Sequence, residues 1–361
     1  MSQSDAEAIT EVEHRKHFVA LDGLRGLAAI SVVIFHFMEM AILDYTKNFI
    51  GHGFLAVDFF FCLSGFVMGY AYDDRIRTLG FIRFVRHRLI RLHPMVVFGA
   101  VLGLLAFLFD PFMPVPASYG VGRIAMLFLT TLLVVPYPTM VERTHNLFGL
   151  NAPEWSLFWE YIASIVYALV LWRVARPALG VLLCIAALWL GICGYRDGWI
   201  YNGWDANGFW TGAARVSFSF LAGLFIYRYH LIWKNNLHFC AIGALLVLTF
   251  VMPFFSHEWL AEELVVFVFY PLLIMMGAGI HVSGVTEKLC SFLGRLSYPL
   301  YMTHYVALWI FMNFYQHHTI GYGMTAFIIG LSVTSLTIFA YGVMRFVDEP
   351  LRRRLRHMEK S

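Results

Sequence analysis

The stretch ALDGLRGLAAISVVIFHFMEMAI, residues 20–42, decides the class of fold. A helix needs about 20 predominantly apolar residues to cross the hydrocarbon core of a bilayer, and this stretch is long enough. It nevertheless contains Arg25 and His36. A charged side chain at the bilayer centre costs about 2.5–3.5 kcal/mol on insertion scales, so such residues are candidates for function. We therefore predict a membrane-spanning helix that carries functional polar side chains.

The composition extends this prediction to the whole chain. Of its 361 residues, 60% are hydrophobic and 14% are charged, and the mean hydropathy is +0.68. Soluble domains carry about 25% charged residues, so lipid has to be the solvent for much of this surface. Ten further apolar segments lie at 53–72, 94–110, 121–137, 154–172, 179–195, 209–228, 238–255, 262–281, 294–315 and 323–346. The expected fold class is an all-α polytopic transmembrane helix bundle, with membrane lipid as a partner and no nucleic acid.

The distribution of Lys and Arg predicts the topology, because these residues concentrate in cytoplasmic loops. Basic residues at 15–16, 83–91 and 352–356 place the N-terminus, the second connection and the C-terminus on the cytoplasmic side. Two cytoplasmic termini require an even number of crossings. The segment 121–137 is short, contains Arg123 and ends at prolines. We therefore expect about ten spanning helices, with 121–137 as a re-entrant or interfacial segment.

The chain divides into three expected parts. Residues 1–18 form a cytoplasmic N-terminal tail, residues 19–348 form the membrane domain, and residues 349–361 form a basic cytoplasmic C-terminal tail. The five cysteines are scattered and show no CxxC or CxxH spacing. Neither a disulfide framework nor a metal site is therefore expected.

Arg25 and His36 are the first pair of candidate functional residues. They are 11 residues apart, which is about 16 Å along a helix and close to three full turns. Both side chains therefore share one face at different depths. The alternative is that Arg25 lies at the membrane interface and that His36 is a hydrogen-bonded histidine of the bundle interior.

Asp58 begins the second helix at a depth similar to that of His36 in the first. A carboxylate at this depth can orient an imidazole and fix its tautomer. We therefore consider Asp58 as the partner of His36, with pairing to another helix as the alternative. The sequence Ser64-Gly65, farther along, predicts a close helix-packing contact rather than a nucleophile.

Two later segments contain further polar candidates. In Glu154-Trp-Ser-Leu-Phe-Trp-Glu160, Glu160 lies one to two turns inside the membrane, whereas Trp155 by itself is a common interfacial anchor. In Ser297-Tyr-Pro-Leu-Tyr-Met-Thr-His304, structural hydrogen bonding by Ser297, Tyr298, Tyr301 and His304 is at least as good an interpretation as chemistry.

Arg88 and Arg91 stand one helical turn apart near Arg25. They could be no more than a topology signal. Arginine also binds phosphates through paired donors, so the two residues are candidates for a phosphate-rich ligand. The sequence thus places cations at the inner side and an acid–base set of His36, Asp58 and Glu160 toward the outer side.

Six motifs in this order resemble acyltransferase family 3, the bacterial membrane-bound O-acyltransferases that modify surface polysaccharides. They are Leu-Asp-Gly-Leu-Arg-Gly at 21–26 with the Arg25-x10-His36 spacing, Val-Asp-Phe-Phe-Phe-x-Leu-Ser-Gly-Phe at 57–66, Arg88-x-x-Arg91-x-x-Pro94, Trp155-Ser-Leu-x-x-Glu160, Leu-Gly-x-Leu-Ser-Tyr-x-Leu-Tyr-x-x-His at 293–304 and Glu349-Pro350. Each motif is weak alone. The resemblance nevertheless extends from Leu21 to Pro350.

The resemblance implies transfer of an acyl group, usually acetyl from acetyl-CoA, to a hydroxyl of a glycan or another acceptor. It implies that His36 is the general base, that Arg25 lies on the donor path and that Arg88 and Arg91 contact the CoA phosphates. It assigns no role to Trp155 or to the 297–304 stretch. A multi-pass protein of the bacterial inner membrane is expected, with acyl-CoA as co-substrate and no permanently bound cofactor.

Two other functions remain open from the sequence. An acyltransferase that modifies a small molecule or a lipid would use the same residues. A proton-coupled transporter or flippase could use the buried acid–base residues as a relay, although transporters are often built from internal repeats and none is detected here.

Overall fold

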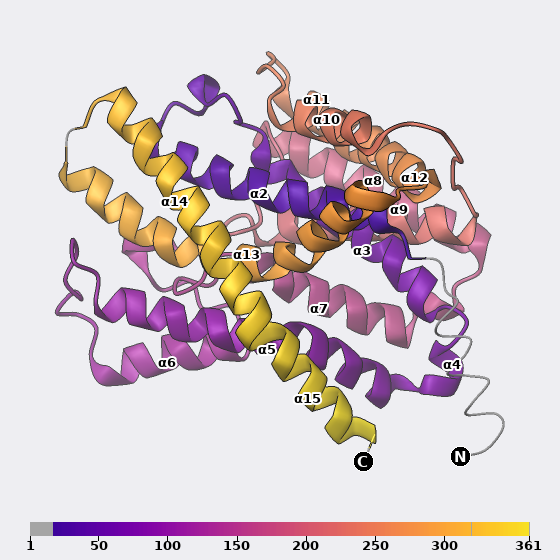
Figure 1. Cartoon of the computed structure of the whole chain (residues 1–361), viewed down its shortest axis with the longest axis horizontal. Helices are drawn as coiled ribbons and strands as arrows, with labels where there is room; N and C mark the ends of the chain where they lie inside the picture. Colours follow the sequence, from indigo (N-terminus) through magenta and orange to yellow (C-terminus); the bar gives the residue numbers. More distant parts are fainter. Residues whose placement is uncertain (1–16, 319, 361) are drawn as a thin grey trace.

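The computed structural model describes residues 17–318 and 320–360, so most of the expected N-terminal tail lies outside the described residues. The described chain is helical throughout its regular parts (Figure 1). The α-helices are α2 (Val19–Ala41), α3 (Ala56–Tyr72), α4 (Ile76–Leu79), α5 (Phe81–Leu108), α6 (Val121–Leu132), α7 (Glu154–Leu169), α8 (Arg176–Asp197), α9 (Phe209–Arg228), α10 (Phe239–Phe250), α11 (Glu258–Leu264), α12 (Tyr270–Gly279), α13 (Gly284–His317), α14 (Tyr322–Val343) and α15 (Glu349–Lys360). Short 3-10 turns lie at Tyr45–Lys47, Gly53–Leu55, Val141–Arg143 and Leu171–Arg173, and π-turns at Val265–Phe269 and Met344–Asp348.

Each apolar segment of the sequence forms a helix, which confirms the all-α polytopic bundle. Seven helical segments in the described chain are long and apolar enough to cross a membrane, and α6 and α10 are shorter apolar helices. With 12 residues, α6 spans about 18 Å, less than the hydrocarbon core. The expected number of ten crossings stays a prediction.

Helix α2 packs along α13 through small residues at the end that contains Arg25. A Cβ on Gly26 would collide with the backbone of Leu293, and a Cβ on Gly294 would collide with Asp22. Small residues let membrane helices approach closely, because no bulky side chain separates their backbones. This packing brings the motifs of α2 and α13 together although they are more than 260 residues apart.

Helices α3 and α9 make a second close crossing. A Cβ on Gly65 would collide with the carbonyl oxygen of Phe220, and a Cβ on Gly223 would collide with the carbonyl oxygen of Cys62. The close packing that the sequence predicts at Gly65 is confirmed. The crossing also fixes which helix faces the polar residues of α3.

The C-terminal helices α14 and α15 continue each other through the π-turn at Met344–Asp348 and run diagonally across the bundle (Figure 1). Functional residues gather in two regions of the bundle. The "cavity end" contains the end of α2 near His36 and the loops 42–55, 141–153 and 198–208. The "arginine end" contains Arg25, Arg88, Arg91 and Arg352.

Candidate active site

A cavity of about 320 Å³ opens at the cavity end, between α2, α13 and the loops. His36 and Glu39 of α2 line it together with Arg215 of α9. The remaining wall combines aromatic side chains with aliphatic and polar ones. The aromatic lining residues include Tyr45, Trp155, Trp199, Tyr201, Trp204, Tyr301, Tyr305 and Trp309.

His36 belongs to a chain of hydrogen bonds at this cavity. Its Nδ1 lies 3.0 Å from Oε2 of Glu39, one turn farther along α2, and the Tyr201 hydroxyl donates to the other oxygen of Glu39. Burial, and then the negative charge of Glu39, raise the pKa of Tyr201, so its hydroxyl stays protonated and donates. A carboxylate can only accept, which assigns the proton to Nδ1 and leaves Nε2 of His36 as the basic nitrogen.

His304 of α13 is stacked beside His36. The two ring centroids are 5.5 Å apart with an interplanar angle of 22°. Nδ1 of His304 donates to the carbonyl oxygen of Tyr301 at 2.8 Å, while its buried Nε2 has no partner among the described residues. Tyr305 lies edge-on to both imidazoles. The α13 motif therefore forms one wall of the His36 site.

The other motif residues of α7 and α13 make structural hydrogen bonds. The hydroxyls of Tyr301 and Ser156 lie 2.7 Å apart at the cavity wall, and Tyr298 donates to the carbonyl oxygen of Leu92. Trp155 is 7% exposed and lines the cavity, so it is not the interfacial anchor that its position alone suggested.

The prediction that Asp58 orients His36 is wrong. Asp58 is fully buried and accepts two hydrogen bonds from Arg215, at 3.1 Å from Nε and at 2.6 Å from Nη2. The physical reason is the close α3–α9 crossing, which turns this face of α3 toward α9 and not toward α2. Asp58 thus pairs with another helix, the alternative that the sequence left open.

Glu160 is also separate from the His36 site. It forms an ion pair with Arg88 and accepts a hydrogen bond from Ser64 at 2.6 Å. Arg88 is buried, and its Nε donates to Ser164. The expected acid–base set of His36, Asp58 and Glu160 is therefore not assembled, because each carboxylate has an arginine partner of its own.

The guanidinium groups at the arginine end differ in their hydrogen-bond partners. Arg25 donates to the Ser297 hydroxyl at 3.1 Å and to the Gly294 carbonyl oxygen at 2.7 Å. Arg91 is exposed and makes no hydrogen bond or ion pair with any residue that the structure describes. It interacts electrostatically with Arg25, Arg88 and Arg352. Arg91 is thus the guanidinium of this group with its donors available.

Three residues of the site escaped the sequence analysis. Glu39 lies three residues after His36 in an apolar helix, a spacing that could have identified it. Arg215 is an arginine inside an apolar segment and could have been matched to Asp58 by the same reasoning. Tyr201 lies in a loop, and nothing in its surrounding sequence points to Glu39.

Comparison with known proteins gives consistent matches. A family model described as an acyltransferase domain matches residues 18–343. Protein 2 in the picA locus of Rhizobium radiobacter is 35% identical over 179 residues, which cover 46% of this chain and 85% of that protein. The O-acetyltransferase OatA of Staphylococcus aureus is 23% identical over 381 residues, covering 98% of this chain and 60% of that protein. The chain thus spans less than two thirds of the staphylococcal relative's length, and no solved structure matches it.

Proposed function

This chain belongs to the acyltransferase family whose model matches residues 18–343, and from that premise we propose that it transfers an acetyl group from acetyl-CoA to a hydroxyl of a cell-surface polysaccharide, lipopolysaccharide or related glycan. Its membership and its O-acetyltransferase relative make it an O-acyltransferase. The main support for acetyl transfer to a glycan hydroxyl is the imidazole of His36, which Glu39 orients at the cavity.

In the proposed reaction, Nε2 of His36 takes the proton of the acceptor hydroxyl. The oxygen attacks the thioester carbonyl carbon, the new C–O ester bond forms and the C–S bond breaks. The CoA thiolate leaves and receives the proton from the imidazolium, so no net proton is released. A positioned general base contributes typically 10²–10⁴-fold to the rate, because a neutral alcohol is a poor nucleophile.

Glu39 supports this role by holding the imidazole. Its oxygen at 3.0 Å from Nδ1 fixes the tautomer and stabilises the imidazolium that forms during proton transfer. Tyr201 in turn holds Glu39. Glu39 and Tyr201 are therefore positioning residues for His36, a part that the sequence analysis assigned to Asp58.

The aromatic cavity supports a hydroxyl-rich acceptor. A volume of about 320 Å³ falls at the lower end of the 300–1,000 Å³ range of small-molecule sites, enough for a sugar unit. The indole N–H groups of Trp204 and Trp309 are buried and have no partner in the described chain, although both residues line the cavity. Buried donors without partners are rare, so hydroxyl oxygens of a ligand would satisfy them.

The donor would approach from the arginine end. Arg91 has no partner of its own among the described residues, so its guanidinium suits a phosphate of CoA. Arg25 lies near it and would add positive charge, while its own Nε and Nη2 are bonded to Ser297, Gly294 and Asp22. Arg88 would contribute through the local charge, since its own donors are bonded to Glu160 and Ser164. The thioester end would then extend along α2 toward His36.

The proposed location of the protein is the bacterial inner membrane. The basic residues of the 83–91 segment and of α15 would lie on the cytoplasmic side, in agreement with the positive-inside rule. In this orientation residues 19–348 would form the membrane domain and both tails would lie in the cytoplasm. The donor site would then lie on the side where acyl-CoA is made, and the cavity on the outer side.

The proposal is tested by mixing purified protein with acetyl-CoA and a candidate glycan and following release of free thiol. Acceptor-dependent thiol release supports it. If the natural acceptor is a small molecule or a lipid, thiol release will still require acetyl-CoA, but it will depend on that acceptor and not on the glycan. Proton-coupled transport without any acetyl-CoA consumption would instead support the transporter hypothesis.

A further inference from the structure

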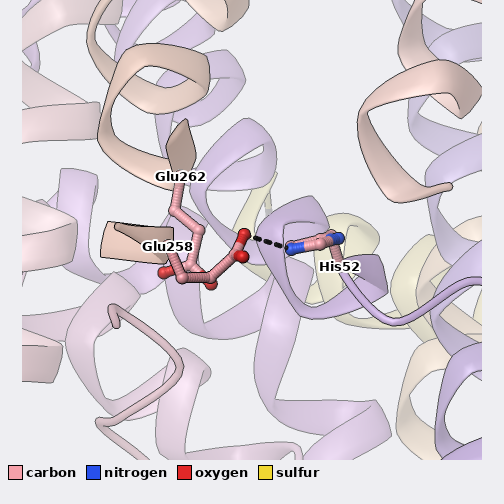
Figure 2. Close-up of side chains that lie close together, drawn as sticks. All are labelled: His52, Glu258 and Glu262. Atoms are coloured by element: carbon pink, nitrogen blue, oxygen red, sulfur yellow. Dashed lines mark hydrogen bonds and ion pairs between the residues drawn. The ribbon is translucent and has the colours of Figure 1, made fainter. Parts of the chain in front are cut away.

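His52, Glu258 and Glu262 form a compact cluster at the cavity end (Figure 2). His36 is not a member of this cluster. One potential ligand atom from each residue lies within 4.8 Å of the others. The Nε2 atom of His52 and Oε1 of Glu258 are 2.7 Å apart. His52 belongs to the loop before α3, and the two glutamates stand one turn apart on α11. Figure 2 shows their carboxylates beside one edge of the imidazole ring.

Most of the cluster is enclosed by protein, and Glu258 is its most exposed member. The side chains of His52 and Glu258 are 0% and 12% exposed, and Glu262 is 1% exposed. Within the described residues, neither glutamate is paired with Lys or Arg. Buried charges are normally paired or coordinate a metal, because leaving water without compensation is costly. Arg215 acts on Glu262 only through longer-range attraction, so the two adjacent carboxylates and the imidazole form a set of ligands that a cation could bind.

We propose that His52, Glu258 and Glu262 bind one divalent transition-metal cation, of which Zn²⁺ is the best-fitting example. Imidazole nitrogen and carboxylate oxygen are both accepted zinc ligands, at about 2.0–2.2 Å. Ligand atoms of a tetrahedral site then lie about 3.3 Å apart. The separations here are 2.7 Å for the hydrogen-bonded pair and at most 4.8 Å overall. Shifts of about 1 Å or less would bring the three ligands into place.

The imidazole favours Zn²⁺ over Mg²⁺ or Ca²⁺, which prefer oxygen ligands alone. The fourth position can be filled by water, because Glu262 itself lines the cavity. One oxygen of Glu262 already accepts the Ile200 N–H at 2.7 Å, and one oxygen of Glu258 accepts the Phe255 N–H at 2.6 Å. These bonds hold both carboxylates in place, as hydrogen bonds to metal-ligating side chains do in metal sites.

The cation would connect three segments that form the cavity wall. His52 belongs to the loop that contains the cavity residues Asn48 and Gly51, and Ile200 is next to Tyr201, which holds Glu39. The site is thus structural in this proposal. It fixes the loops around the acceptor cavity, whereas His36 lies outside the coordination sphere.

The test measures metal binding without acyl transfer, so its failure would leave the proposed function untouched. The full-length protein is purified in detergent with a tag that contains no histidine, treated with chelator and exchanged into chelator-free buffer. Calorimetric titration with ZnCl₂, and separately with MnCl₂, gives stoichiometry and affinity. Metal analysis of protein that was never exposed to chelator identifies the native ion.

One equivalent of cation per chain is expected for the wild type. Glu258→Gln and Glu262→Gln should weaken binding by more than the roughly 10–100-fold typical of removing a residue that only hydrogen-bonds to a metal ligand. Glu263→Gln is the matched control, because Glu263 is the adjacent buried glutamate of α11 and lies outside the cluster. Elution as a monodisperse peak shows that each variant is folded.

A second readout is the thermal unfolding midpoint, which should rise with the cation in the wild type and in Glu263→Gln only. Absence of stoichiometric binding in folded wild-type protein would overturn the proposal, and so would equal binding by Glu258→Gln and Glu262→Gln. The contact between His52 and Glu258 would then be an ordinary structural hydrogen bond.

Discussion

Nδ1 of His36 and Oε2 of Glu39 lie 3.0 Å apart on one face of α2. The base and the carboxylate that orients it therefore belong to the same helix, and Tyr201 from a neighbouring loop holds the carboxylate in place. Nε2 of His36 is the nitrogen left for chemistry, because Nδ1 donates to the carboxylate.

This relationship predicts that Glu39→Gln lowers kcat by about 10–100-fold, less than the 10²–10⁴-fold contribution of a general base. An amide can donate as well as accept, so it no longer fixes the tautomer of His36. Tyr201→Phe should have a smaller effect in the same direction, since it removes only the hydrogen bond that holds Glu39. Steady-state kinetics with saturating donor measures both. Unchanged kcat in folded Glu39→Gln would remove its positioning role.

The arginine end predicts different outcomes for two neighbouring residues. Arg91→Ala should raise the KM for acetyl-CoA while leaving thermal stability unchanged, because Arg91 has no partner within the described residues. Arg88→Ala should instead destabilise the fold by about 3–5 kcal/mol, since it leaves the carboxylate of Glu160 without its buried partner. Donor titrations and unfolding curves separate the two. Equal donor affinity in Arg91→Ala would reduce Arg91 to a topology signal.

Asp58→Asn should act through stability and not through the chemical step. Asp58 forms a fully buried pair with Arg215, and breaking such a pair costs about 3–5 kcal/mol. The measurement is the thermal unfolding midpoint together with the activity per folded molecule. A normal unfolding midpoint combined with lost activity would show that Asp58 takes part in catalysis.

The helices were predictable from the sequence because their signal is local. Length and apolarity decide whether a segment spans a bilayer, and each expected segment is helical here. The contact at Gly65 was predictable for the same reason, since a small residue in an apolar helix permits close approach.

The partners of the buried charges were not predictable in this way. Counting residues gives the depth of Asp58 along its helix, but the partner depends on which helix its face meets. The crossing at Gly65 and Gly223 turns α3 toward α9, so Asp58 meets Arg215. His52 and Glu258 are 206 residues apart in the sequence, so their contact depends on the tertiary fold.

The cavity predicts that Trp204→Phe weakens acceptor binding and leaves donor binding unchanged. The variant keeps an aromatic ring and removes a buried N–H that has no partner among the described residues. One hydrogen bond contributes about 0.5–1.5 kcal/mol, so the KM for the acceptor should rise roughly 2–10-fold. Trp210→Phe is the control, because Trp210 is exposed and lies outside the cavity. An equal change in both variants would argue against a hydrogen bond to the acceptor.

The most direct test of the account is acetyl transfer by His36→Ala, with the exposed His257 replaced by alanine as control. Both variants should insert into the membrane and elute as the wild type does. We predict that transfer falls by at least about 10²-fold in His36→Ala, the lower limit for loss of a general base, and stays normal in His257→Ala. Full transfer by correctly inserted His36→Ala protein would contradict the assignment of His36 as the base.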